Sequence, residues 1–263
     1  MNKILLGTDK IENEKIDEAV KIKMLKKQKF IGVCTLKIKV LKSTDLQIEY
    51  DSDDIKYDIY VDLDSSVNLN LYEIKRKGSY KISYHYDLKQ KSSLNICAVN
   101  DAESVKENII VNLNGEEAKA NYLLKTISKM EEKYNVMVYH NAKKTESLII
   151  NEGVSIRKGK LIFNVSGFVL KGIKGCTLNQ NNRIINLTNE KSQINPNLFI
   201  DENDCVANHS AHIGKCNENE LFYLMSRGIT KETAENLIIR GFLTKNLEFY
   251  KKDMVKIIDK YWR

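Results

Sequence analysis

The sequence contains very little proline and little glycine: one proline, Pro196, and twelve glycines in 263 residues. Both counts fall below the usual proportions for a globular protein. A chain this poor in the two residues has no Pro-rich or Gly/Ser-rich linker, so we do not expect a string of flexibly joined domains. Other residues must make the turns, and asparagine, aspartate, serine and lysine do separate the apolar segments.

Long apolar runs are also missing. No segment approaches the roughly 20 apolar residues that a membrane helix needs, and the first apolar stretch, residues 4–6, is too short for a signal peptide. We therefore expect a cytoplasmic protein without membrane contact. The five cysteines are an odd number, which argues against a disulfide framework in that compartment. The net charge of +7 is too small to indicate a nucleic-acid binder.

The dominant pattern is an alternation of apolar and polar residues through residues 30–200. Segments such as 35–40, 57–63 and 160–165 alternate, and such segments recur about every 10–12 residues. The pattern predicts many short β-strands. It is typical of a sandwich, a barrel or a β-solenoid alike, and periodicity alone does not choose between them. Within this region the stretch 116–133 favours a helix.

Helices are predicted at both ends of the chain. Residues 9–29 carry apolar residues near helical spacing, with acids at the start and lysines at the end. Near the other end, Asn217 can cap a first helix, Thr230 can cap a second, and Gly228 fits the turn between them. We therefore divide the chain into an N-terminal helical segment, 1–29, a β-core, 30–216, and a C-terminal helical module, 217–263.

One cluster of potential metal ligands stands out. Cys205, His209, His212 and Cys216 are spaced C-x3-H-x2-H-x3-C, and thiolate and imidazole are ligands for soft and borderline metals. The spacing differs from that of a zinc finger, which separates its two ligand pairs by about 12 residues. No nucleophile elbow, His-Glu-x-x-His or dinucleotide-binding motif is present, so we do not expect an enzyme.

The segment 196–241 resembles the C-terminal signature of the SufB/SufD family, which assembles iron–sulfur clusters in the SUF system. The likeness is most specific at 221–228, which reads Leu-Phe-Tyr-Leu-Met-Ser-Arg-Gly. Upstream, His140, Thr145 and Ser147 are similar to a His/Thr/Ser turn of the family. The positions that match in the C-terminal segment are Pro196, Leu198, Ile200, His209, Ala211, Gly214, Phe222, Tyr223, Leu224, Ser226, Arg227, Gly228 and Ile229.

This resemblance implies a right-handed parallel β-helix core followed by a helical module. Family members pair through their β-helices, as SufB with SufD or as two SufB chains, and an ABC-type ATPase, SufC, docks on their helices. The resemblance thus implies a short, SufD-like scaffold or partner subunit that shares a transient iron–sulfur cluster and catalyses nothing by itself. On this chain the ATPase would dock on Leu221, Phe222, Tyr223, Leu224, Ser226, Arg227, Gly228 and Ile229.

Several positions depart from the family pattern. Near Asn182 the family carries a cysteine in SufB and a histidine in SufD. The cysteine usual at Ala207 is displaced to Cys205, and Ser210 stands where SufB has glutamate. The candidates for cluster or metal ligands in this chain are therefore Cys176, Cys205, His209, His212 and Cys216.

Two other interpretations stay open on the sequence alone. One is an unrelated β-solenoid binding module, and the other is a metal-binding protein that uses Cys205, His209, His212 and Cys216. The apolar residues of 217–262 are numerous enough to cover the end of a solenoid and still leave a docking patch. Whether the partner in the β-helix contact is a second copy or a SufB-like chain is not decided by the sequence.

Overall fold

The computed structural model describes residues 1–6, 11–14, 18–28, 33–50 and 56–262. In these residues the chain forms seventeen strands and then three helices. The strands are β1 (Asn2–Leu6), β2 (Ile11–Glu14), β3 (Val20–Gln28), β4 (Val33–Val40), β5 (Thr44–Tyr50), β6 (Lys56–Leu63), β7 (Asn68–Lys75), β8 (Ser79–Leu88), β9 (Ser93–Asn100), β10 (Ser104–Leu113), β11 (Lys119–Ser128), β12 (Glu131–His140), β13 (Glu146–Ser155), β14 (Lys160–Val169), β15 (Cys176–Asn186), β16 (Gln193–Ile200) and β17 (Cys205–Gly214). The helices are α1 (Glu218–Ser226), α2 (Lys231–Thr244) and α3 (Lys251–Tyr261).

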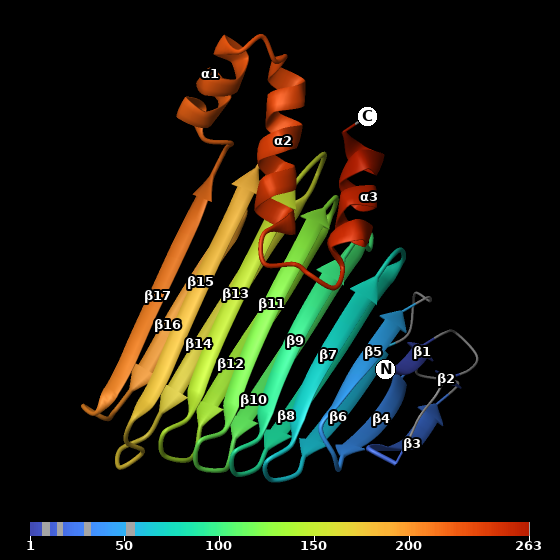
Figure 1. The fold of residues 1–263 in the computed structure, drawn as a ribbon, viewed down its shortest axis with the longest axis vertical. Helices are drawn as coiled ribbons and strands as arrows, with labels where there is room; N and C mark the ends of the chain where they lie inside the picture. The colour runs from blue at the N-terminus through green and yellow to red at the C-terminus, as the bar shows by residue number, and fades with distance from the viewer. Residues whose placement is uncertain (7–10, 15–17, 29–32, 51–55, 263) are drawn as a thin grey trace.

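The strands form a parallel β-helix, which confirms the predicted fold class. From β4 onward, successive strands alternate between two facing sheets, so that each turn of the solenoid contributes one strand to each sheet (Figure 1). The nine-stranded sheet runs β17-β15-β13-β11-β9-β7-β5-β1-β2, and the eight-stranded sheet runs β16-β14-β12-β10-β8-β6-β4-β3. Among the described strands, the only antiparallel pairs lie at the N-terminal end, where β2 pairs with β1 and β3 pairs with β4.

Side chains at equal positions of successive turns stack on one another. Lys56 pairs with Lys81 in an early turn, and Ile162 pairs with Gln193 in the last one. Alternate residues of the strands from β5 to β15 point inward, and the burial of β14 alternates along its whole length. One inward column consists of Ile59, Tyr84, Ile109, Val136 and Val165, all at most 1% exposed.

Non-glycine residues make the turns, as the low proline and glycine content requires. Ser66, Lys91, Glu117 and Lys144 lie in successive turns, and each has a positive φ between 56° and 62°. The backbone N–H of each donates to a carbonyl oxygen of the following turn, at 2.8–3.2 Å. This bond offsets the cost of the left-handed conformation, so the turn repeats without glycine.

The predicted helix over 9–29 is wrong, as is the predicted helix over 116–133. In the first range, the described residues form β2 and β3, and β3 pairs antiparallel with β4; residues 9–10, 15–17 and 29 lie outside the described part. In the second, β11 and β12 continue the two sheets. An open strand edge offers a full ladder of backbone hydrogen bonds, and that pairing outweighs helix propensity.

The first two C-terminal helices begin where their caps predict. Asn217 accepts the backbone N–H groups of Asn219 and Glu220, Thr230 accepts that of Thr233, and Gly228 has a φ of 83°. None of the helices in the described part of the chain is long and apolar enough to cross a membrane.

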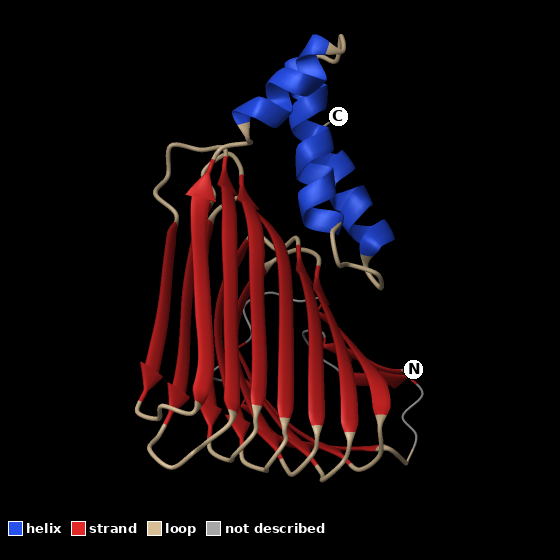
Figure 2. Ribbon diagram, turned by 60° about the vertical axis from the view of Figure 1, so that its left-hand side comes forward, coloured by secondary structure: helices blue, strands red, loops and turns tan. Residues whose placement is uncertain are grey.

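The helices do not cover the end of the solenoid, contrary to the prediction. Instead, α2 and α3 lie along the outer face of the nine-stranded sheet, near the carboxyl ends of its strands (Figures 1 and 2). The last outward residues of the strands are apolar there, and they pack against the helices. The strand side contributes Ile74, Val99, Ile127, Val154 and Ile185, and the helices contribute Ile239, Phe242, Leu243, Met254 and Ile258.

The interior of the β-helix contains a group of buried charges among its apolar columns. The Nζ atom of Lys75 lies 2.7 Å from Glu107 Oε1 and 3.7 Å from Glu73 Oε2, and Tyr84 donates to Glu73. Further along, Glu132 accepts hydrogen bonds from Thr126 and Tyr134. Burial raises the pKa of Glu73 and of Glu132 to about 7.

Glu132→Gln should remove the part of the pH dependence of stability that comes from this buried carboxyl. The pKa of Glu132 is raised from 4.5 to about 7 in the folded chain, so the folded state binds the proton more tightly. Stability is therefore lost as the pH rises through that window. In urea unfolding, the variant should match the wild type at pH 5 and exceed it by about 1–3 kcal/mol at pH 8.

The matched control for this prediction is Glu131→Gln, because Glu131 neighbours Glu132 but its side chain is 45% exposed. That variant should follow the wild type within about 0.5 kcal/mol at both pH values. A wild type and Glu132→Gln pair that unfold alike at pH 8 would show that the buried carboxyl carries no such linkage.

Candidate functional site

The candidate site residues lie on two surfaces: the last turn of the β-helix, and helix α1. The last turn consists of β16 and β17, which we call the open end. In the described part of the chain, no strand pairs with the outer edge of either strand. Most residues of β17 are exposed, whereas alternate residues of β14 and β15 are buried. The open end therefore presents unpaired backbone groups together with the ends of the inward columns.

Strand β17 separates the predicted metal ligands. Cys205 and His209 continue the inward columns of Cys176 and Gln180, whereas His212 pairs with the exposed Arg183. Four residues of extended strand span about 13 Å, so Cys205 and His209 are too far apart to share one ion.

Cys216 lies beyond the strand, buried against the helices. Among the residues that the structure describes, no group of three or more His, Cys, Asp or Glu side chains is placed to hold a metal ion. The structure therefore does not bring Cys205, His209, His212 and Cys216 together in one group.

A different pair of cysteines does come together. Cys176 and Cys205 are register partners on β15 and β17, and both thiols donate to the carbonyl oxygen of Ile173, at 3.7 Å each. Cys176 is 1% exposed, and Cys205 is half-buried. Burial raises the pKa of the Cys205 thiol above its ordinary value, so this thiol is protonated near neutral pH.

His140, Thr145 and Ser147 form one hydrogen-bonded group behind the two thiols. Thr145 Oγ1 lies 2.7 Å from His140 Nδ1 and 3.3 Å from Cys176 Sγ, and His140 Nε2 lies 2.9 Å from Ser147 Oγ. Burial lowers the pKa of His140 to about 4, so its imidazole is neutral. Thr145 also donates to the carbonyl of Ala142, so the group fixes the position of the Cys176 side chain.

Asn182, at the position where the family carries a ligand, has a structural role here. It is 2% exposed, accepts a hydrogen bond from Asn151 at 2.7 Å and donates to the carbonyl of Ser210. Its amide therefore holds three successive turns together.

Helix α1 presents large apolar side chains to solvent. Phe222 is 75% exposed, Tyr223 is 58% exposed and Met225 is 46% exposed, and we call these three residues the α1 face. The guanidinium of Arg227 lies 5.2 Å from the centre of the Tyr223 ring, and Ser226 donates to the Tyr223 carbonyl. None of the residues of α1 is buried. An exposed aromatic cluster of this kind is typical of a protein contact.

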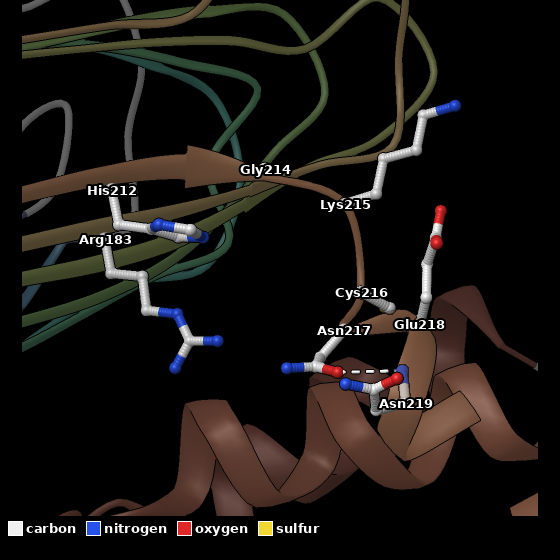
Figure 3. A pocket seen from close by; sticks show the side chains of 8 residues that line it. All are labelled: Arg183, His212, Gly214, Lys215, Cys216, Asn217, Glu218 and Asn219. Carbon is white, nitrogen blue, oxygen red and sulfur yellow. Dashed lines mark hydrogen bonds between the residues drawn. The ribbon is translucent and has the colours of Figure 1, made fainter. Parts of the chain in front are cut away.

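A cavity joins the two surfaces. Figure 3 shows the side chains of Arg183 and His212 extending from the sheet toward the start of α1, where Asn217 accepts the N–H of Asn219. Its other lining residues are Gly214, Lys215, Cys216 and Glu218. The open end and the start of α1 therefore lie next to each other.

Some residues of these surfaces carry no signal in the sequence. Arg183 and Lys215 belong to no motif, and the exposed Phe199 and Val206 look like ordinary strand residues in an alternating pattern. A column of stacked rings, Tyr139, Phe168 and Phe199, reaches the open end with centroids 4.6 and 4.9 Å apart. Only the register between turns reveals this column.

Comparison with known proteins gives one consistent result. Residues 48–242 match the family model described as "SUF system FeS cluster assembly, SufBD core domain". The iron–sulfur cluster assembly protein SufD of Bacillus subtilis is 33% identical over 170 residues, which cover 62% of this chain and 39% of that protein. A SufBD family protein of Mycobacterium tuberculosis is 30% identical over 134 residues, covering 50% of this chain and 16% of that protein. The chain thus spans about two fifths or less of these relatives.

Phe242→Ala and Phe222→Ala should differ sharply in their effect on stability. Phe242 is buried in the apolar cluster that the sheet and the helices share, with the Arg183 guanidinium 5.1 Å from its ring centre, whereas Phe222 is exposed. In denaturant unfolding, Phe242→Ala should lower stability by about 3–4 kcal/mol, and Phe222→Ala should change it by less than about 0.5 kcal/mol. A large loss with Phe222→Ala would mean that the α1 face belongs to the core.

Proposed function

The chain belongs to the SufB/SufD family of SUF iron–sulfur cluster assembly proteins, and from that premise we propose that it is a short, SufD-like scaffold subunit. In this proposal it pairs through its β-helix, docks an ABC-type ATPase on its helices and has no catalytic turnover of its own. The observation that carries the proposal is the adjacency of the open end and the α1 face, two uncovered surfaces beside one cavity.

Pairing would take place at the open end. Its strands offer free backbone groups, and Phe199 and Val206 expose apolar surface at 54% and 58%. A second chain that extends the sheets would pair with the free backbone groups and also cover the exposed apolar side chains. The partner is either a SufB-like subunit or a second copy of this chain.

The ATPase would dock on α1. The exposed residues of the predicted set, Phe222, Tyr223, Ser226, Arg227 and Gly228, face solvent, while Leu221, Leu224 and Ile229 are half-buried. Bulky aromatic residues beside an arginine are typical of the anchors of protein interfaces. Because α2 and α3 are packed on the sheet, a movement of the docked ATPase would be transmitted to the β-helix.

The iron–sulfur cluster would be a cargo that the paired subunits share. Cys205 and His209 lie at the open end, with Cys176 behind Cys205, and thiolate and imidazole are both known cluster ligands. One chain supplies too few ligands at one point, so the partner must complete the set. His212 and Cys216 lie away from the inward columns and are weaker candidates.

The two alternative functions have less support. An unrelated solenoid binding module would not be expected to match the family model over 48–242. A metal protein based on the four-ligand cluster lacks its site among the described residues.

Replacing Phe222 and Tyr223 together by aspartate should abolish binding of the SufC-like ATPase. The two carboxylates would put charge into an apolar contact while leaving the fold intact, because both side chains are exposed. In co-purification and titration with the ATPase encoded by the same organism, affinity should fall at least tenfold.

Leu170→Asp is the matched control, since Leu170 is 68% exposed in the turn before β15, at the other end of the strands. It should bind the ATPase like the wild type. Unchanged affinity of the Phe222→Asp, Tyr223→Asp variant would place the interface elsewhere.

Ala211→Arg should prevent pairing at the open end. Ala211 is exposed and continues the inward column of Asn182, so a long charged side chain there would obstruct an added turn without destabilising the single chain. Analytical ultracentrifugation, alone and with a SufB-like chain, should show pairs for the wild type and for Ser65→Arg, a control in an exposed turn. Pairs of undiminished affinity with Ala211→Arg would exclude this interface.

A further inference from the structure

The two thiols at the open end form a pair within a single chain, whereas the proposed cluster site needs a partner chain to complete its ligands. Cys176 and Cys205 occupy equal positions of adjacent parallel strands, which lie about 4.8 Å apart. Both thiols point at the carbonyl oxygen of Ile173, which lies 3.7 Å from each sulfur. We propose that Cys176 and Cys205 form a two-coordinate binding site for a soft monovalent metal ion of the Cu(I) type. This site would exist in the isolated chain.

The separation of the two strands suits a metal bridge between the two thiolates. A metal–thiolate bond is about 2.3 Å long, so two bonds in line span about 4.6 Å, close to the strand spacing. The in-register pair therefore fits a linear dithiolate without movement of the backbone.

The number and type of donors select the ion. No third His, Cys, Asp or Glu completes a ligand set with the two thiols among the described residues, so the four-coordinate geometry of Zn²⁺ is not supplied. Apart from the Thr145 hydroxyl and nearby backbone carbonyls, the surroundings are apolar, and soft thiolates favour Cu(I) over harder ions. The apolar side chains packed around the pair are Val169, Ile173, Leu178, Leu198 and Ile200.

The binding reaction balances without a redox step. The ion displaces one proton from each thiol, which gives a bis-thiolate complex of charge −1 and two released protons. Cys205 is half-buried in the last turn, while Cys176 is closed off behind it. The ion therefore enters through the open end, and a subunit that covered this end would close the site.

The test is a competition titration of the reduced, full-length chain with the Cu(I)–bicinchoninate complex under anaerobic conditions. The wild type should remove one equivalent of Cu(I) per chain, seen as loss of the chelate absorbance. Cys205→Ser and Cys176→Ser should each weaken this binding at least tenfold. The Cys97→Ser, Cys216→Ser variant, which changes two cysteines outside the pair, should keep it. Zn²⁺ should not displace the bound Cu(I).

Several outcomes would overturn the proposal: a wild type that removes no copper, a Cys176→Ser, Cys205→Ser variant that removes as much, or one ion per two chains. Circular dichroism checks that each variant is folded. If the buried Cys176→Ser variant fails to fold, the Cu(I) affinity of Cys205→Ser, at the half-buried position, is the test of the site. No ATPase or partner chain is present in this experiment. Its failure therefore leaves the proposed scaffold function untouched, and failure of the docking or pairing experiments leaves this site untouched.

Discussion

Each turn of this β-helix is held by the turns before and after it, through backbone ladders and through side chains stacked at equal positions. Amides of Asn108, Asn135, Asn164 and Asn195 are linked one to the next along the outer face of the eight-stranded sheet. The inward columns and the N–H bonds between turns likewise link each turn to the next. Because every turn needs a neighbour on both sides, the last turn is left with an unsatisfied edge. The proposed pairing surface and the proposed Cu(I) site, which both lie at the open end, follow from that constraint.

The buried charges are compatible with this repeat because they pair within a strand and across the interior. Lys75 lies at an inward position of β7, between Glu73 of its own strand and Glu107 of the facing sheet. An unpaired buried charge would cost several kcal/mol, but the neighbouring turns supply the partner. The charges therefore meet across the interior rather than by stacking, since Lys75 pairs in register with Asn100, and Glu107 with Ile82 and Tyr134.

Much of the fold could be predicted from the sequence, because alternation is a local property. Most strands from β4 onward, with β11 and the start of β12 excepted, and the caps at Asn217 and Thr230 are encoded within a few residues of themselves. The helix predicted over 9–29 failed for the opposite reason: β3 exists because β4 offers an edge, and propensity does not contain that information.

The candidate site was harder to predict because it depends on register. Cys205 and His209 are close in sequence and look like neighbours, but an extended strand holds them apart. Cys176 and Cys205 are distant in sequence and lie side by side. The offset between paired turns is not constant, since it is shorter for Lys56 and Lys81 than for Ile162 and Gln193. No fixed period in the sequence therefore brings the right pairs together. The α1 face, by contrast, was found from a contiguous motif, which needs no register.

The dependence of each turn on its neighbours also determines how the molecule opens. In such a linear array, releasing an internal turn breaks two interfaces, whereas releasing the final turn breaks one. The helices α2 and α3 add further contacts to the middle of the array, along β7 to β15. Local unfolding should therefore begin at β16 and β17 and progress inward. A subunit bound at the open end would convert the terminal turn into an internal one. The whole array would then unfold as one unit.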